Sequence, residues 1–271
     1  MTDLYAVIGN PIAQSKSPRI HTEFARQLGQ DLRYEAILAP LDGFVAAIAR
    51  FRAAGGCGLN VTAPFKVEAF AVATECTERA EHAGAVNTLK FAGTSVLGDN
   101  TDGAGLIRDI QERLGFELSG RRVLIMGAGG AARGIVLPLL HERPASLVIA
   151  NRTVAKAQAL ERRFAPFGPV QGGGYADLAG RAFDLVINAT SASLSGELPP
   201  LPPGVFAPGS LAYDLVYGTE FTPFLVEARG HGAAQVGEGL GMLLAQAAES
   251  FWLWRGMRPD IRPVIELLRR G

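Results

Sequence analysis

The sequence carries no excess of charge of either sign. Its 26 lysine and arginine residues balance 26 aspartate and glutamate residues, so the formal net charge at pH 7 is zero. A chain without a net field has no long-range attraction to nucleic acids or to anionic membrane surfaces. This balance argues against both classes of partner, and we expect a small-molecule ligand instead, with no nucleic acid and no membrane.

Cysteine, histidine and long apolar runs are also scarce. The chain has two cysteines and four histidines, scattered without the spacing of metal ligands, which argues against a disulfide framework and against a bound metal. No run of about 18 apolar residues occurs, and the N-terminus lacks the basic and apolar regions of an export signal. These absences predict a cytoplasmic protein.

What is present is an ordinary globular composition in a chain of 271 residues, of which 48% are hydrophobic. Single cores stop growing near about 250–300 residues, so two domains are expected. Short apolar segments at 5–8 and 34–38 alternate with helical patterns after Ser17 and over 44–54. This alternation is typical of an α/β fold with βαβ units and predicts a parallel sheet. Ser17 followed by Pro18 predicts a helix N-cap with proline in the first turn.

The second half of the chain has the pattern of a doubly wound nucleotide-binding domain. A buried strand over 122–126 runs into glycines and a helix, and further strands are expected over 147–150, 184–187 and 211–215. That order of elements predicts a Rossmann domain. We expect a first domain over 1–102, the Rossmann domain over 103–238, and C-terminal helices over 239–271 that return to the first domain.

The glycines after the strand over 122–126 form a dinucleotide-binding pattern. Residues Gly127, Ala128, Gly129, Gly130, Ala131 and Ala132 make a G-x-G-x-x-A arrangement that opens a helix. In this setting the first glycine permits a tight turn, the second lets the backbone approach a pyrophosphate, and the small last residue allows close packing of the helix. The alternative is a glycine-rich turn that only packs a helix on a sheet.

The residues after the next strand predict NADP rather than NAD. NAD sites place an acidic residue there to accept from the ribose 2′-hydroxyl, but this chain has Asn151, Arg152 and Thr153, with Lys156 one turn later. A guanidinium and an ammonium attract a 2′-phosphate, which an acid would repel. The alternative is that Arg152 is only a solvated surface arginine.

Four polar segments in the first domain fall at the ends of predicted strands. They are GNPIAQSKSP (9–18), NVTAPFK (60–66), GAVNT (84–88) and GDNTDG (98–103). Together with the glycine pattern, with Asn-Arg-Thr at 151–153, with YDLVY at 213–217 and with GLGML at 239–243, they resemble the shikimate dehydrogenase family. The resemblance runs nearly from end to end of the chain, although Gln14 and Ala63 stand where many relatives have histidine and valine.

The resemblance implies a substrate domain and a Rossmann NADP domain flanking a cleft. It also implies reversible reduction of 3-dehydroshikimate to shikimate by NADPH, in the pathway to chorismate and the aromatic amino acids, by a monomer or homodimer. A quinate/shikimate dehydrogenase of broader specificity and a non-catalytic nucleotide-binding regulator are the alternatives. A dehydrogenase of folate one-carbon units ranks last, because the serine-rich loop does not support it.

The same resemblance implies roles for particular residues. Lys66 and Asp102 are the implied catalytic pair, with the choice open between proton delivery by the lysine and simple charge stabilisation; Asp102 could instead only cap a helix that begins at Gly103. The implied substrate ligands are Ser15, Ser17, Thr62, Lys66, Asn87, Asp102, Tyr217 and Gln246. The implied nicotinamide neighbours are Leu215 and Gly239.

Overall fold

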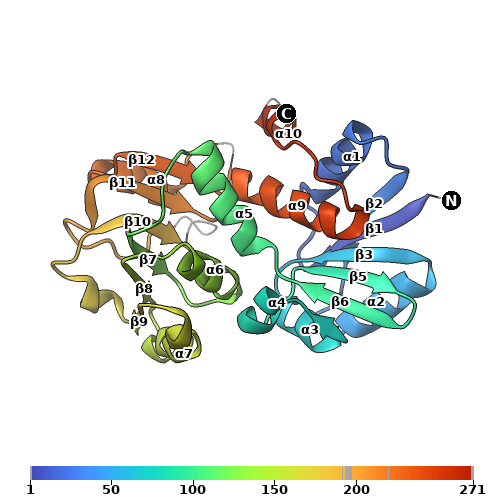
Figure 1. The fold of residues 1–271 in the computed structure, drawn as a ribbon, viewed down its shortest axis with the longest axis horizontal. Coiled ribbons are helices and arrows are strands. Elements are labelled where there is room, and N and C mark those ends of the chain that lie inside the picture. Colours follow the sequence, from blue (N-terminus) through green and yellow to red (C-terminus); the bar gives the residue numbers. More distant parts are fainter. Residues whose placement is uncertain (1, 191, 193–196, 219, 270–271) are drawn as a thin grey trace. The chain divides into compact units, whose positions relative to one another are not determined.

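The computed structural model describes residues 2–190, 192, 197–218 and 220–269. The chain divides into two compact units, one formed by Met1–Gly105 with Leu244–Gly271 and the other by Leu106–Leu243. The division falls within two continuous helices, α5 (Asp102–Arg108) and α9 (Leu240–Arg255). The expected limits after residues 102 and 238 lie just before these positions, at the points where the helices begin. Figure 1 shows the elements of both units.

The first unit contains a six-stranded sheet in the order β2-β1-β3-β5-β6-β4. Its strands are β1 (Asp3–Gly9), β2 (Leu32–Leu38), β3 (Gly56–Val61), β4 (Glu75–Cys76), β5 (Thr88–Ala92) and β6 (Ser95–Asp99). The predicted parallel pairing is found for β1 with β2 and β3, whereas β5 runs antiparallel to both β3 and β6. Only Gly93 and Thr94 connect β5 to β6, and so short a link can join antiparallel strands but not parallel ones.

Helices cover both faces of this sheet. The helices of this unit are α1 (Ser17–Gln27), α2 (Phe44–Ala53), α3 (Lys66–Val72), α4 (Glu78–Ala83), the end of α9 and α10 (Arg262–Arg269). Helix α1 buries Ile20 and Phe24 as its spacing predicts. The predicted N-cap at Ser17 is wrong, because the helix begins at Ser17 and Lys16 is the capping residue. The Ser17 backbone N–H instead donates to Oγ of Ser15 at 3.3 Å, which tightens the preceding loop.

Alternation along the central strands gives the sheet two different faces. Ala6, Ile8, Leu59 and Val61 belong to one core, which α2 and α3 complete. The other face carries the side chains of a second cluster, Tyr5, Val7, Ile12, Tyr34 and Trp254. This second face also bears a polar residue, Asn60 on β3, which is buried. A buried amide requires hydrogen-bond partners, and those partners lead to the candidate site.

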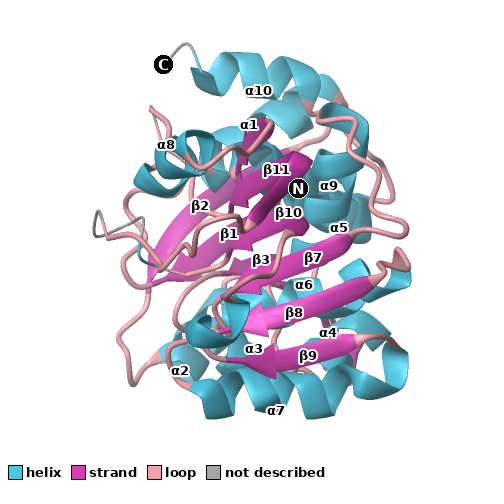
Figure 2. Cartoon of the chain, turned by 90° about the vertical axis from the view of Figure 1, so that its left-hand side faces the viewer, coloured by secondary structure: helices cyan, strands magenta, loops and turns pink. Residues whose placement is uncertain are grey.

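The second unit contains a wholly parallel sheet in the order β12-β11-β10-β7-β8-β9. Its strands are β7 (Arg122–Met126), β8 (Ser146–Ala150), β9 (Val170–Gly173), β10 (Phe183–Asn188), β11 (Phe206–Asp214) and β12 (Gln235–Glu238). Counted from β7, this is the doubly wound order 3-2-1-4-5-6 of dinucleotide-binding domains. The fold class is therefore as predicted, and Figure 2 shows the parallel run of β7, β8 and β9.

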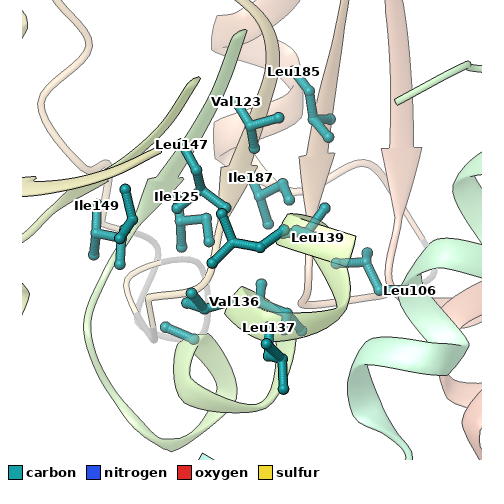
Figure 3. Close-up of a cluster of buried hydrophobic side chains, with 14 of the residues drawn as sticks. Leu106, Val123, Ile125, Val136, Leu137, Leu139, Leu147, Ile149, Leu185 and Ile187 are labelled. Carbon is teal, nitrogen blue, oxygen red and sulfur yellow. The ribbon is translucent and has the colours of Figure 1, made fainter. Parts of the chain in front are cut away.

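Apolar side chains bury both faces of the second sheet. The larger cluster joins β7, β8 and β10 to α6 (Gly130–His141) and α7 (Val154–Phe164), as Figure 3 shows for Ile125, Leu139 and Ile187. The opposite face packs on α8 (Pro223–Gly230). Burial on both faces explains why these strands read as continuous apolar runs.

A turn of π-helix over Asp109–Arg113 follows α5. Asp109 is buried and binds Arg113 through both carboxylate oxygens, at 2.5 and 2.8 Å. The Tyr213 hydroxyl also donates to Asp109, at 2.7 Å. Residue 241 is glycine because a Cβ there would overlap this carboxylate. The ion pair therefore connects the π-turn, β11 and the start of α9 within the second unit.

Candidate active site

Lys66 and Asp102 form a close ion pair in the first unit. Lysine Nζ lies 2.5 Å from Oδ2 of Asp102, and the two side chains are 21% and 8% exposed. Lys66 is the first residue of α3, and Asp102 is the first residue of α5. Because Asp102 lies inside its helix and directs its carboxylate to Lys66, it is not the helix cap that the sequence allowed. A mostly shielded, charge-assisted hydrogen bond of this kind holds the ammonium at a defined point.

Asn87 holds the other oxygen of the Asp102 carboxylate. Its Nδ2 donates to Oδ1 of Asp102 at 2.8 Å and also approaches Oε1 of Gln246 at 3.2 Å. Its Oδ1 accepts from the backbone N–H of Thr101 at 2.9 Å. A backbone N–H can only donate, so this contact decides which end of the amide faces the aspartate. Four of the predicted ligands, Lys66, Asn87, Asp102 and Gln246, are thus joined in one hydrogen-bonded group.

The topology of the first sheet explains why residues so distant in sequence meet. Strands β1, β3 and β6 run in the same direction and end at one edge, from which the chain continues to Asn10, Thr62 and Asn100. Strand β5 runs the opposite way, so its beginning lies at that same edge, directly after Asn87. The reversal of β5 therefore places Asn87 beside the residues that follow β6.

The segment after β6 is anchored by buried polar contacts. Asp99 accepts two hydrogen bonds from Arg79, at 2.5 and 2.6 Å, and one from Thr77 at 2.6 Å. Asn100 donates to the Ala85 carbonyl at 2.9 Å. These contacts fix the backbone that carries Asp102.

Ser15 and Thr62 lie on the loops after β1 and β3, and Ser17 is the first residue of α1. Ser17 is buried, and Ser15 and Thr62 are half-buried. The Thr62 backbone N–H donates to the Ile8 carbonyl at 3.0 Å, which joins the two loops at their roots. Within the described part of the chain no hydrogen bond links these three side chains directly to Lys66 or Asp102.

Sequence reasoning missed the residues behind this group. Thr101 and Ser250 are fully buried, and Thr101 Oγ1 lies 3.2 Å from Oε1 of Gln246. The Ser250 hydroxyl donates to the Gln246 carbonyl at 3.1 Å. A signal for Ser250 was available, because it follows Gln246 by four residues on an apolar helix and so shares its face. No local signal marks Thr101, whose contacts are made across the fold.

The glycine pattern of the second unit forms the predicted strand–turn–helix. Gly127 follows β7 with φ of +108°, and a Cβ there would lie 3.0 Å from the Ala189 carbonyl. Gly129 is the N-cap of α6, and a Cβ at Gly129 or Gly130 would meet nothing within 4 Å. The backbone N–H groups at this helix start are therefore open to a phosphate, which helix N-termini attract. This geometry fits a dinucleotide pyrophosphate.

Two exposed cations follow β8, next in the sheet to β7. Asn151 donates to the Thr153 carbonyl at 2.9 Å, which shapes the turn. Arg152 and Lys156 are exposed, and neither forms an ion pair with an acidic side chain in the described ranges. The arrangement is chemically suited to a 2′-phosphate and offers no acid for a ribose hydroxyl.

The predicted nicotinamide neighbours lie against each other. A Cβ at Gly239 would overlap the Leu215 carbonyl, so only glycine lets β12 approach this closely. Both residues follow strands, β11 and β12, that end at the same edge. Tyr217 is half-buried two residues further, and burial raises the pKa of its hydroxyl. It therefore stays a neutral donor or acceptor.

Neither a metal centre nor a membrane span is found in the described residues. No group of three or more histidine, cysteine, aspartate or glutamate side chains there could hold an ion. No helix in the same ranges combines the length and apolarity needed to cross a bilayer.

Comparison with known proteins connects both units to one family. Residues 7–89 match the shikimate dehydrogenase substrate-binding domain, residues 109–195 match shikimate/quinate 5-dehydrogenase, and residues 239–269 match the shikimate 5′-dehydrogenase C-terminal domain. A curated relative from Nitrosospira multiformis, named shikimate dehydrogenase (NADP(+)), is 64% identical over 269 residues, covering 99% of this chain and 98% of its own.

Solved structures agree with these matches. An enzyme from Pseudomonas putida described as Ael1 is 51% identical, with a TM-score of 0.92 and 98% of each chain covered. Shikimate 5-dehydrogenase from Thermus thermophilus, solved with NADP(H) and shikimate, is 33% identical, with a TM-score of 0.89 and 99% of each chain covered. The chain belongs to the shikimate dehydrogenase family.

Proposed function

We propose that this chain is an NADP-dependent oxidoreductase that interconverts 3-dehydroshikimate and shikimate on the route to chorismate and the aromatic amino acids. The observation that carries the proposal is the group formed by Lys66, Asp102, Asn87 and Gln246, in which a shielded ion pair is surrounded by donors and acceptors suited to a polyol. The names of the relatives support the same substrate and cofactor.

Ser15 and Ser17 bind the substrate carboxylate. They lie before and at the start of α1, where hydroxyl donors and the helix N-terminus favour an anion. Thr62, Asn87 and Gln246 bind the ring hydroxyls, because each side chain can donate and accept. Tyr217, whose hydroxyl stays neutral, is a further proposed substrate ligand.

Lys66 acts at the oxygen of the ring ketone. As the carbon–oxygen double bond becomes single, charge develops on that oxygen, and an ammonium in hydrogen-bonding distance stabilises it or delivers its proton. Asp102 orients the ammonium through Oδ2 and accepts from a neighbouring ring hydroxyl. Bound NADPH supplies the hydride through its nicotinamide ring.

The second unit selects and holds the cofactor. The turn formed by Gly127, Ala128, Gly129, Gly130 and Ala131 receives the pyrophosphate. Asn151, Arg152, Thr153 and Lys156 receive the 2′-phosphate, and Leu215 and Gly239 border the nicotinamide. No residue of the proposed mechanism requires a metal.

We place the reaction in the cytoplasm, carried out by a monomer or homodimer. Cys57 and Cys76 are both free thiols, a state that suits a reducing compartment.

The direct test is the initial rate of NADP reduction with shikimate for the wild type and Lys66→Met, with shikimate binding titrated in parallel. We expect the variant to bind shikimate and to lose about 10²-fold or more in rate, as for other positioned acid–base groups. A pH profile of an Asp102 or Lys66 variant then separates proton delivery from charge stabilisation. A wild type that binds NADPH but leaves shikimate unchanged rules out the proposed substrate.

The same assay with quinate and NAD tests the broader-specificity alternative. Rates with quinate or NAD comparable to those with shikimate and NADP favour it, because they require tolerance at the ring and at the 2′-phosphate. Tight NADPH binding without turnover of either acid favours a binding protein.

A further inference from the structure

We propose that Tyr34 is a positioning residue for the Lys66–Asp102 pair, acting through a buried chain of hydrogen bonds that begins at Asn60. Tyr34 lies on the edge strand β2 and belongs to none of the binding segments described above. The inference rests on the proposed function, because its effect is measured on shikimate turnover. It concerns residues behind the substrate site, none of which touches the reacting atoms.

The chain begins where the Tyr34 hydroxyl donates to Oδ1 of Asn60 at 2.7 Å. Tyr34 is 7% exposed and Asn60 6% exposed, so water does not readily replace either partner. The His21 ring lies parallel to the tyrosine ring with centroids 4.3 Å apart, which fixes the direction of the hydroxyl. Burial raises the pKa of Tyr34 well above 10, with a hydrogen bond to the Ser17 side chain opposing the shift in part, so the hydroxyl keeps its proton and remains a donor.

The amide of Asn60 connects Tyr34 to two buried hydroxyl groups. Because its Oδ1 accepts from Tyr34, its Nδ2 faces Ser250 Oγ at 2.9 Å and Thr88 Oγ1 at 3.2 Å. Ser250 and Thr88 are themselves 2.7 Å apart. An amide can accept only at oxygen and donate only at nitrogen, so Tyr34 selects the orientation in which Asn60 donates to both hydroxyls.

Thr88 connects this cluster to the catalytic pair. Its hydroxyl donates to Oδ1 of Asn87 at 2.9 Å, beside the Thr101 backbone N–H that binds the same oxygen. Asn87 Nδ2 then donates to Asp102, whose other oxygen holds Lys66. Every donor from Tyr34 to Asn87 points toward the carboxylate, and hydrogen bonds aligned in this way polarise one another.

Loss of the Tyr34 hydroxyl leaves Oδ1 of Asn60 buried without its donor. A flip of the Asn60 amide then becomes favourable, because the oxygen can find another donor. The flip places the amide oxygen, in place of the NH2 group, next to Ser250 and Thr88. The Thr88 hydroxyl can then donate to Asn60 and is no longer directed to Asn87. The expected result is a less constrained Asn87–Asp102 contact and a less constrained ammonium, with no change in the second unit.

Tyr5, which lies outside the hydrogen-bond chain, provides a matched control. Its Cα is the register partner of Tyr34 on the adjacent strand, it is 3% exposed, and its ring stacks on Trp254 in the same apolar cluster. Its hydroxyl, however, contacts Arg255 rather than Asn60. Tyr34→Phe and Tyr5→Phe therefore remove the same atom from neighbouring buried tyrosines, and only the first removes it from the proposed chain.

The experiment measures kcat and KM for shikimate and NADP, together with urea unfolding, for wild type and both variants. We expect Tyr34→Phe to lower kcat/KM for shikimate about 10-fold, the loss typical of an orphaned buried partner, with KM for NADP within about twofold. Tyr5→Phe should keep wild-type kinetics even where it loses as much stability. Unchanged shikimate kinetics in Tyr34→Phe, or an equal loss in both variants, overturns the proposal.

Ser250→Ala removes a hydroxyl that contacts both Asn60 and Thr88, and it serves as a second variant that leaves the Tyr34–Ser17 contact intact. It should show the same selective loss for shikimate, and the double variant should lose less than the product of the single losses, since both act on one path. Fully multiplicative losses overturn the proposal. A wild type inactive on shikimate rejects the proposed function, whereas an active wild type with an unaffected Tyr34→Phe rejects only this inference.

Discussion

Asn87 donates to one carboxylate oxygen of Asp102 while Lys66 occupies the other. The aspartate is therefore held at both oxygens, and rotation of its carboxylate would break at least one of the two hydrogen bonds. A carboxylate clamped in this way directs the lysine more strictly than an ion pair alone. The first prediction follows from that clamp.

Asp102→Asn should lower kcat with shikimate by about 10²-fold, in the range of lost acid–base or charge-stabilising groups. The neutral amide cannot form the ion pair, so Lys66 loses its orientation. Steady-state kinetics with shikimate check this. Asp184→Asn, which removes an ion pair to Arg122 in the second unit, should leave kcat unchanged, and a near-normal rate in the Asp102 variant would remove the aspartate from the mechanism.

Arg152→Gln should raise KM for NADP about 10-fold or more while leaving any rate with NAD unchanged. The reason is the loss of a charge-assisted contact to the 2′-phosphate, which NAD lacks. Arg162→Gln, on the same helix as Lys156 but near its other end, is the matched control. If both variants raise KM for NADP equally, the cause is the loss of one positive charge from the protein and not the loss of a contact to the 2′-phosphate.

His21 should make the fold sensitive to acid. The ring is fully buried among Phe24, Tyr34 and Phe251, and neither ring nitrogen has a partner of hydrogen-bonding geometry among the described residues. Burial lowers its pKa to about 3, with the Asn60 side chain opposing the shift in part. Below pH 6.5 the histidine of the unfolded chain binds a proton, whereas that of the folded chain stays neutral. The free energy of unfolding therefore falls as the pH drops below 6.5, and this histidine does not change it above pH 6.5.

The measurement is urea unfolding of wild type and His21→Phe at pH 7 and pH 5. A loss of about 1.4 kcal/mol per pH unit below 6.5 predicts that wild type loses about 2 kcal/mol more than the variant over this interval. Parallel pH dependence in the two proteins would mean that the folded histidine accepts its proton normally.

Gly241→Ala should destabilise the second unit by about 2 kcal/mol or more. The added methyl would overlap the buried Asp109 carboxylate. Arg113 and Tyr213 hold this carboxylate in place, so it cannot move aside easily. Urea unfolding checks this, with Gly230→Ala as the control. A Cβ at Gly230 meets nothing within 4 Å, so that variant should match or slightly exceed wild-type stability.

The family, the α/β fold class and the dinucleotide turn were predictable because their signals are local. Gly127 and Gly129 follow an apolar strand directly, and the physical demands on that turn are met within a few residues. The predicted strands of the second unit also appear near their expected positions. Short strands such as β4, β9 and β12 were missed, because two to four residues carry too little pattern to stand out.

The antiparallel course of β5 and the hydrogen-bonded chain behind the site could not be predicted in this way. Residue Asn60 meets Ser250 across 190 positions of sequence, and no spacing rule connects them. The N-cap expected at Ser17 was wrong for a local reason. Lys16 already has helical backbone angles, so the helix starts one step earlier than the side-chain preference implies.

The tight turn at Gly93 and Thr94 offers a place to attach reporters to the enzyme. It closes the hairpin of β5 and β6 at the end of the strands opposite Asn87 and Asp99. Gly93 has φ of +57°, and a Cβ there would meet nothing within 4 Å. A fluorophore or an immobilisation tag inserted at this turn would lie a strand's length from Lys66, so the reaction could be followed on a surface or at the level of single molecules without a label near the proposed site.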